Sequence, residues 1–179
     1  MDWDNIIMYG LIGLAVSLSL SYMNKGTNQS VGRNAEGFVE LRMNKFYQIL
    51  GYVVLSLGFI ILLVIIYYQE KEMTLIGALA ILFVVGLGLP VLLYYRNHKV
   101  YFNEETVTVI SWTGKKQMVR WEEIQKISFN AFSGYLKLFG LAEKVKMHQH
   151  LVGLKEFIKM MEEKTNWTAK SIGFSQMLK

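Results

Sequence analysis

Three long stretches without a charged residue constrain this chain more than any other feature of its sequence. The first runs from Asn5 to Asn24, the second from about Phe46 to Tyr68, and the third from about Met73 to Tyr95. The hydrocarbon core of a bilayer is ~30 Å thick, and about 20 helical residues at ~1.5 Å each cross it. All three stretches meet that length, so the sequence predicts three membrane-spanning helices.

The first stretch has a rival interpretation as a cleaved signal peptide. A signal peptide begins with a positively charged region and ends in small residues before the cleavage site. Here the preceding residues include Asp2 and Asp4 and no lysine or arginine. A retained first span within residues 1–24 is therefore the preferred interpretation, with cleavage as the alternative.

The second and third stretches are separated only by Gln69–Glu72, which predicts a tight membrane hairpin over residues 46–95. Each stretch ends in a pair of tyrosines, whose apolar ring and polar hydroxyl suit the membrane–water interface. A hairpin buried in a soluble protein would carry a polar face on each helix, and neither helix has one. No ionisable residue lies at membrane depth, which argues against a transporter, a proton relay or a selective channel.

Basic residues set the expected orientation of the spans. The connector over residues 25–45 carries Lys25, Arg33, Arg42 and Lys45, and more basic residues follow the third span. Cytoplasmic segments next to spans are enriched in lysine and arginine. We therefore expect the connector and the C-terminal domain in the cytoplasm, with the N-terminus and the hairpin turn outside.

From about Lys99 the apolar residues alternate with polar ones, as in strands that have one wet face. In residues 126–130, for example, Ile127 and Phe129 alternate with polar side chains. Short strands at close spacing favour a barrel or a sandwich. The predicted strands cover residues 100–103, 107–112, 117–121, 125–130, 135–139 and 145–150.

A helical period returns in residues 151–164, and the tail over residues 167–179 has no clear period. An amphipathic helix has to bury its apolar stripe against a sheet or a partner. We therefore expect an α-helical membrane anchor followed by an α+β domain over residues 96–166. The expected apolar stripe is Leu151, Leu154, Phe157, Ile158 and Met161.

An apolar hairpin, about six short strands and one amphipathic helix together resemble the bacterial pleckstrin-homology-like (PH-like) domains attached to membrane hairpins. Two motifs carry the resemblance: WEEI at Trp121–Ile124 and GLKEF at Gly153–Phe157. The segment Phe38–Lys45 is similar to the lead-in that precedes the hairpin in that family. The resemblance covers residues 37–166.

The resemblance implies a bent antiparallel sheet or barrel closed at one end by the C-terminal helix. It also implies a bacterial inner membrane, self-assembly as one version of the function, and an edge strand that residues 38–42 could add to the sheet. The family signature in this chain would be Trp121, Glu123 and Ile124.

Residues that would carry catalysis are not evident. The chain has no cysteine, and it lacks the G-x-S-x-G, H-E-x-x-H and phosphate-loop motifs. Neighbouring glutamates such as Glu122 and Glu123 mostly point apart and are solvated. His148 and His150 share a strand face, but a metal site needs further ligands. We therefore expect no enzyme activity, no metal and no cofactor.

Basic residues beside the spans suggest contact with anionic lipid. In the eukaryotic pleckstrin-homology relatives, basic residues near one hairpin hold phosphoinositide headgroups. The fuller basic motif of those relatives is missing here, so a generic attraction of about 1 kcal/mol per basic residue is the preferred account. Trp112 and Trp121 are equally compatible with the core and with an interface. The candidate lipid contacts are Arg96, Lys99, Lys115, Lys116 and Arg120.

The main functional hypothesis is a non-enzymatic, membrane-tethered module that binds a partner protein or assembles with itself. The alternatives are an anionic-lipid-sensing module and an accessory subunit of a transporter, channel or membrane enzyme. The net charge of +5 follows from the orientation of the spans and from anionic lipid. It therefore does not call for a nucleic acid, and no small-molecule substrate is evident.

The predicted topology can be tested with a protease added outside intact cells. Residues beyond 100 should resist cleavage until the cells are lysed, because the membrane shields the cytoplasmic side. Immunoblotting with an antibody against the C-terminus measures the protected fragment. Loss of that epitope in intact cells, or a full-length protein that stays in solution without detergent, would contradict the topology.

Overall fold

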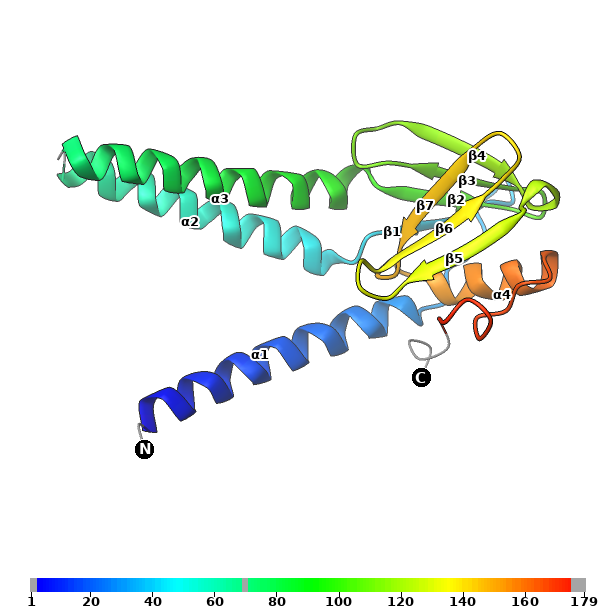
Figure 1. Ribbon diagram of the computed structural model, residues 1–179, viewed down its shortest axis with the longest axis horizontal. Coiled ribbons are helices and arrows are strands. Elements are labelled where there is room, and N and C mark those ends of the chain that lie inside the picture. The colour runs from blue at the N-terminus through cyan, green and yellow to red at the C-terminus, as the bar shows by residue number, and fades with distance from the viewer. Residues whose placement is uncertain (1–2, 69–70, 175–179) are drawn as a thin grey trace. The chain divides into compact units, whose positions relative to one another are not determined.

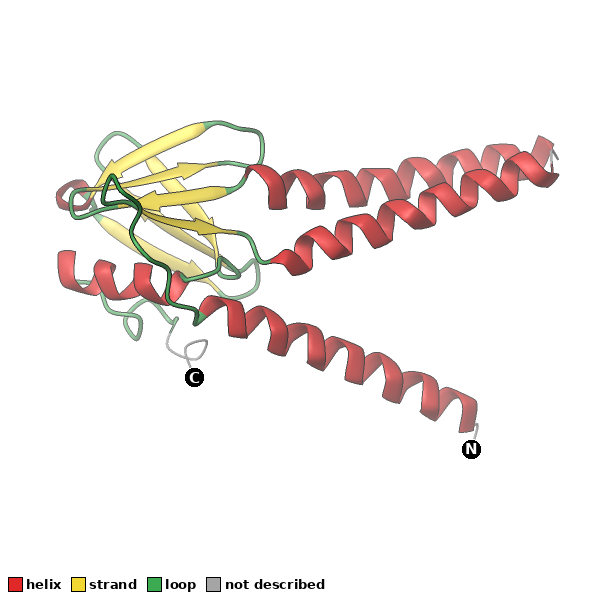
Figure 2. Ribbon diagram, turned by 180° about the vertical axis from the view of Figure 1, so that it is seen from behind, coloured by secondary structure: helices red, strands yellow, loops and turns green. Residues whose placement is uncertain are grey.

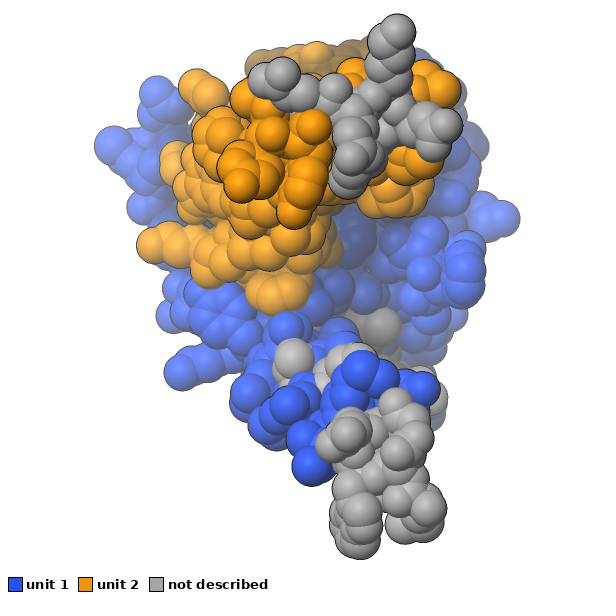
Figure 3. All heavy atoms as spheres, turned by 90° about the vertical axis from the view of Figure 1, so that its left-hand side faces the viewer, with its two compact units in different colours: residues 1–41, 100–109, 117–179 blue, residues 42–99, 110–116 orange. Residues whose placement is uncertain are grey.

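The computed structural model describes residues 3–68 and 71–174, and the chain divides into two compact units. Unit 1 consists of residues 1–41, 100–109 and 117–179, and unit 2 of residues 42–99 and 110–116 (Figure 3). The expected connector over 25–45 and domain over 96–166 stay predictions, and these two units divide the chain differently. The hairpin and one later turn form unit 2, while the segment before the hairpin belongs with the β-rich domain.

Among the described residues, three helices are long and apolar enough to cross a membrane, as predicted. Their candidate spans are 21, 24 and 24 residues long. The first helix extends beyond the expected end at residue 24. Residues 69–70 of the predicted turn at Gln69–Glu72 lie outside the described residues. The helices are α1 (Trp3–Thr27), α2 (Lys45–Tyr68) and α3 (Lys71–Asn97) (Figure 1).

The hairpin of unit 2 packs through glycines, which let two membrane helices approach closely. A Cβ atom on Gly51 of α2 would lie 2.5 Å from Cγ of Leu92 on α3. A Cβ on Gly88 of α3 would lie 3.0 Å from Cδ2 of Leu55 on α2. The aliphatic side chains of one helix thus fill spaces that glycine leaves on the other.

Within residues 3–68 and 71–174, seven strands form two sheets, with the orders β1-β2-β3-β4 and β5-β6-β7 (Figure 2). In the second sheet both pairs are antiparallel. All six predicted strands are present, and the strand suggested at residues 38–42 is β1, beside β2. The strands are β1 (Val39–Arg42), β2 (Lys99–Phe102), β3 (Thr106–Ile110), β4 (Lys116–Arg120), β5 (Lys126–Asn130), β6 (Tyr135–Phe139) and β7 (Lys144–His148).

Four strands end earlier than the sequence predicts, and β2 does so by one residue, at Phe102. Strand β3 stops at Ile110 instead of residue 112, because the backbone turns back between Ser111 and Lys115. Strand β4 stops at Arg120, because Trp121 begins the short 3₁₀ helix η1 (Trp121–Glu123). Strand β7 stops at His148, before a turn at residues 149–150.

The core of unit 1 is built from the inward positions of the strands and from α4 (Leu154–Lys164). The whole predicted stripe from Leu151 to Met161 is buried. Phe157 packs edge-on against Phe102, with ring centroids 5.3 Å apart, and lies 5.4 Å from Trp121. These aromatic contacts join α4 to β2 and to the residue that follows β4.

Helix α4 begins at Leu154, whereas the sequence predicts a start at residue 151. Gly153 precedes it in the left-handed region, at φ 80°, which a residue with a side chain rarely adopts. A Cβ atom on Gly153 would also collide with Val31. Its N–H donates to the carbonyl of Gly26 at 3.1 Å, so this glycine is where the end of α1 meets the start of α4.

The junction between α1 and the β-rich domain lies inside the part expected to be a free connector. Met23, Gly26 and Thr27 are buried. The Thr27 hydroxyl donates to the carbonyl of Gln149 at 3.3 Å. The last turns of α1 therefore dock on the segment between β7 and α4.

The tail is partly built into the core, which the sequence did not indicate. Phe174 is fully buried, and its ring packs edge-on against Phe129 with centroids 4.8 Å apart. The Ala169 N–H donates to Oε1 of Glu162 at 2.6 Å. The domain therefore extends to at least residue 174 instead of ending at 166. Residues 175–179 of the predicted tail lie outside the described residues.

Replacing the buried ring of the tail tests this assignment. Phe174→Ala should destabilise the protein by about 3 kcal/mol or more, because it removes a buried ring and leaves a cavity. Phe132→Ala is the matched control: Phe132 is fully exposed, and its loss should change stability by less than ~0.5 kcal/mol. Thermal unfolding of the full chain in detergent measures both, and equal effects would show that the tail does not contribute to the core.

Candidate functional site

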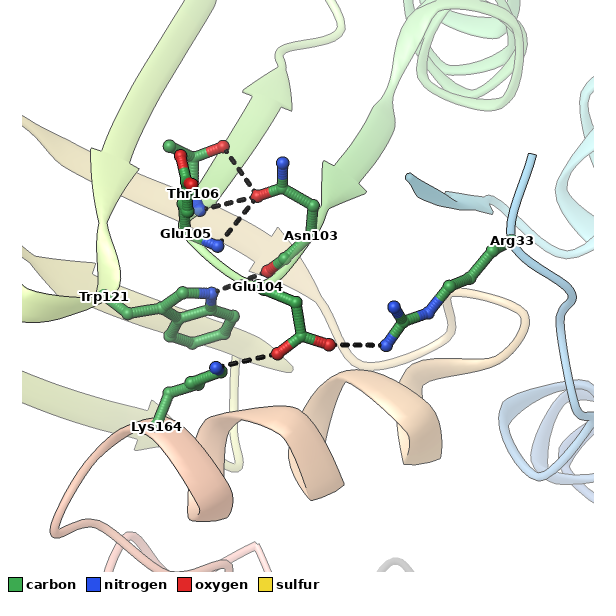
Figure 4. Close-up of polar contacts among 7 residues, drawn as sticks. All are labelled: Arg33, Asn103, Glu104, Glu105, Thr106, Trp121 and Lys164. Atoms are coloured by element: carbon green, nitrogen blue, oxygen red, sulfur yellow. Dashed lines mark hydrogen bonds and ion pairs between the residues drawn. The ribbon is translucent and has the colours of Figure 1, made fainter. Parts of the chain in front are cut away.

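The signature tryptophan lies at one end of the domain, where η1 follows β4. Trp121 is buried, and its indole N–H donates to the carbonyl of Asn103 at 2.9 Å. The side chain of Asn103 accepts from the N–H groups of Glu105 and Thr106 at 3.0 and 2.8 Å. One tryptophan and one asparagine thus hold the turn between β2 and β3 (Figure 4).

A three-membered ion network crosses this end of the domain. The Glu104 carboxylate accepts from Lys164 Nζ at 2.7 Å and from Arg33 Nη2 at 2.6 Å (Figure 4). Hydrogen bonds from these two cations lower the pKa of Glu104 below its ordinary value of 4.5, and Lys164 has the larger effect, followed by Arg33. The network links the segment before β1, the β2–β3 turn and the end of α4. Its members are largely exposed, so water screens it strongly.

Two shallow depressions flank Trp121. One, of about 560 Å³, lies between η1 and the segment after α4 and includes Ile124 and Trp167 in its wall. The other, of about 480 Å³, is lined by Glu104, Arg120 and Lys164, among others. In the second depression, the Glu104 carboxylate is already paired with Arg33 and Lys164. Trp121 belongs to the core, and Ile124 lies in the wall of the first depression.

The candidate lipid contacts do not all come together. Arg96 near the end of α3, Lys99 at the start of β2, and Lys115 and Lys116 after β3 belong to unit 2. Arg120 lies at the far end of β4, ~13 Å from Lys116 at ~3.3 Å per strand residue. It belongs to unit 1, and its Nη1 lies 3.7 Å from Oε1 of Glu122. Arg120 is therefore separate from the other four basic residues.

Within unit 2, the turn over residues 110–116 is tied to the end of α3. The Asn97 side chain donates to the carbonyl of Trp112 at 2.8 Å, and His98 Nδ1 lies 2.9 Å from the carbonyl of Ile110. Trp112 itself is 40% exposed. An exposed tryptophan with four basic residues at the end of a membrane helix is typical of a membrane interface.

The histidines predicted on β7 lie together. The rings of His148 and His150 have centroids 4.9 Å apart, and the His150 N–H donates to Nδ1 of His148 at 3.3 Å. Burial lowers the pKa of His150, which favours the neutral ring. Among the described residues, no group of three or more His, Cys, Asp or Glu side chains could hold a metal ion.

The outer face of the β5–β7 sheet carries a cluster of lysines that the sequence did not reveal. Strand register places Lys126 and Lys144 opposite Phe139, and sets Lys137 directly opposite Lys146. We call Lys126, Lys137, Lys144 and Lys146 the lysine face. The other positions of the face are Ser128, Asn130, Tyr135, Phe139 and His148, none of them acidic.

Aromatic rings of the central strand β6 support two of these lysines. Lys144 Nζ lies 5.0 Å from the ring centroid of Phe139, and Lys146 Nζ lies 5.1 Å from that of Tyr135. A cation over an aromatic ring is attracted by its negative face. The nearby Glu143 is bonded elsewhere, since its Oε2 accepts from the Met118 N–H on β4 at 2.9 Å. The alternation within each strand was visible in the sequence, but the register was not.

Comparison with known proteins does not place the chain in a family. No protein-family model matches it, and no curated protein matches its sequence.

The ion network predicts a pH-dependent effect of Glu104→Gln. The folded-state pKa is lowered, so the stabilisation is present above the ordinary value of 4.5 and is lost as the pH falls through the folded pKa. Thermal midpoints should therefore be lower for Glu104→Gln than for wild type at neutral pH and should converge in acid. Glu105→Gln, at an exposed neighbour, is the control. A Glu104→Gln deficit that persists unchanged in acid would contradict the network.

Proposed function

We propose that this protein is a non-enzymatic, membrane-tethered interaction module, which holds a PH-like domain at the cytoplasmic face for a partner protein. One observation carries the proposal: the domain is joined to membrane-length helices at three points. Helix α1 docks on it through Thr27 and Gln149, and the α2–α3 hairpin is inserted between β1 and β2.

The connections at the hairpin are short. Met43 and Asn44 separate β1 from α2, and His98 alone separates α3 from β2. A flexible tether of many residues would let a domain explore a large volume. Links of one or two residues instead restrict the domain to the membrane surface. Such an arrangement suits a module whose role is to present a surface in a defined place.

The PH-like part of the proposal is supported by the order of the elements. Sheets of four and three strands are followed by one helix whose apolar side is buried against them. This is the arrangement expected of a bent sheet closed by a C-terminal helix. The Trp121 motif lies between the two sheets in the sequence and at the closed end of the domain.

Self-assembly is one version of the proposed function, and an anionic-lipid-sensing role is a second candidate. The second candidate is favoured by the exposed Trp112 beside Lys115, Lys116 and Arg96 in unit 2. Each basic residue close to an anionic leaflet contributes about 1 kcal/mol.

Site-directed crosslinking in native membranes tests the proposal, and the absence of cysteine from the chain provides a clean background. Leu141→Cys is placed at an exposed position of the β6–β7 turn, and Thr113→Cys in the turn of unit 2. With a thiol-reactive photo-crosslinker, Leu141→Cys should yield one discrete protein adduct in stoichiometric amount. The cysteine-free wild type is the control.

Three other outcomes are informative. An adduct with a second copy supports the self-assembly version. Capture of anionic lipid by Thr113→Cys, with no protein captured by Leu141→Cys, would replace the main proposal by the lipid-sensing one. No partner, no self-association and no lipid capture would count against both.

A further inference from the structure

We propose that the lysine face docks an acidic segment of the partner protein. This inference rests on the proposed function and specifies where the partner binds and what its chemistry is. Lys126, Lys144 and Lys146 are exposed and Lys137 is half-buried. Within the described part of the chain, no helix or strand lies over β5–β7 in Figure 1, where this sheet is in front of the other.

The charge arrangement is unfavourable to the isolated protein. Lys137 and Lys146 are directly opposite on neighbouring antiparallel strands, and their Cβ atoms are therefore ~5 Å apart. Like charges in this position destabilise a sheet, and no acidic residue on the face offsets them. An anionic partner would remove this repulsion, so the face is complementary to negative charge.

The spacing points to an extended anion with several charges. Lys126 and Lys144 lie on the two outer strands of the sheet, ~10 Å apart at ~4.8 Å between strands. Four lysines spread over three strands match a ligand that carries several charges better than a single phosphate or carboxylate. The face also has no arginine, the residue whose planar group binds phosphate in a bidentate manner.

The aromatic residues make a nucleic acid a poor fit. Proteins that bind single strands stack bases on open aromatic faces. Here Phe139 and Tyr135 are half-buried, and each carries a lysine ammonium group above its ring. The rings thus position cations and do not offer stacking platforms.

The orientation of the strands argues against the lipid leaflet as the occupant. Gln149, which accepts from Thr27 at the end of the α1 span, follows His148 at the end of β7. Lys146 and Lys144 lie ~7 and ~13 Å further along β7. The surface potential of a leaflet decays over a Debye length of ~8 Å. Lys144 is thus more than one Debye length along the strand from the end that adjoins α1, and competition by anionic lipid tests the leaflet as the occupant.

A second copy of the same face is excluded by its charge, since the whole chain carries +5 and two lysine faces would repel. The remaining occupant is a run of Asp and Glu side chains on another protein.

The experiment measures binding of a fluorescent poly-glutamate peptide to the full-length chain in nanodiscs of neutral lipid. The double variant K137E/K146E should weaken binding about tenfold or more, since two favourable contacts become repulsive. Added salt should weaken wild-type binding as well. K126E/K144E, at exposed positions, provides a second pair should the first alter folding, and thermal midpoints check folding in each case.

The control variant K155E/K159E changes net charge equally at exposed positions of α4 and should retain most of the binding. If K155E/K159E lost as much binding as the lysine-face variants, the effect would be one of net charge alone and the proposal would be overturned. Binding that neither K137E/K146E nor K126E/K144E weakens would also overturn it. Tighter, lysine-face-dependent binding of a single-stranded oligonucleotide would replace the acidic protein by a nucleic acid. Competition by anionic lipid in the disc would replace it by the leaflet.

Failure of this inference is distinguishable from failure of the proposed function. In native membranes, Leu141→Cys combined with K137E/K146E should lose its protein adduct. An adduct that persists in this background leaves the tethered module in place and rejects the lysine face. Absence of an adduct in Leu141→Cys alone rejects the module itself.

Discussion

The structure depends on the pairing of β1 with β2, two neighbouring strands that are separated in the chain by the entire membrane hairpin. Hydrocarbon is the favourable environment for α2 and α3, whose exposed side chains are almost entirely apolar. The strands on either side instead bury one face in the core of the β-rich domain. The helices can lie in hydrocarbon while the adjoining strands lie in the domain core, because the links at Asn44 and His98 are short. The β-rich domain is completed only when the chain returns from the membrane, so anchoring and folding of the domain are parts of one process.

Apolar burial and polar contacts have different roles in this domain. Phe102, Phe157 and Phe174 are almost fully buried, and burial of such side chains contributes a few kcal/mol each, by the usual ~25 cal/mol per Å². The polar contacts at the junctions are weaker because they are exposed to water, but they define which segments meet. The Trp121–Asn103 hydrogen bond holds the β2–β3 turn, and Glu104 connects that turn to the end of α4.

Positive charge is distributed over two surfaces of different origin. The basic residues of unit 2, such as Arg96 and Lys116, follow a membrane helix, where an excess of lysine and arginine is normal. The lysine face lies on a sheet of the other unit and runs along the strands, so the orientation of the spans does not account for it. Two lysines facing each other across β6 and β7 are a cost to the free protein, and it is this cost that indicates a binding surface.

The membrane spans, the strands and the apolar stripe of α4 could be predicted because each is a local property: a run of apolar residues, an alternation, or a helical period within one segment. The pairing of β1 with the sheet was expected only from the resemblance to the PH-like family. The burial of Phe174 and the joining of α1 to Gln149 could not be predicted from such patterns, because they depend on contacts between segments far apart in the chain. The lysine face shows the reason most directly: Lys126, Lys137 and Lys146 lie on separate strands, and only the register, which a shift of one residue would reverse, brings them to the same side.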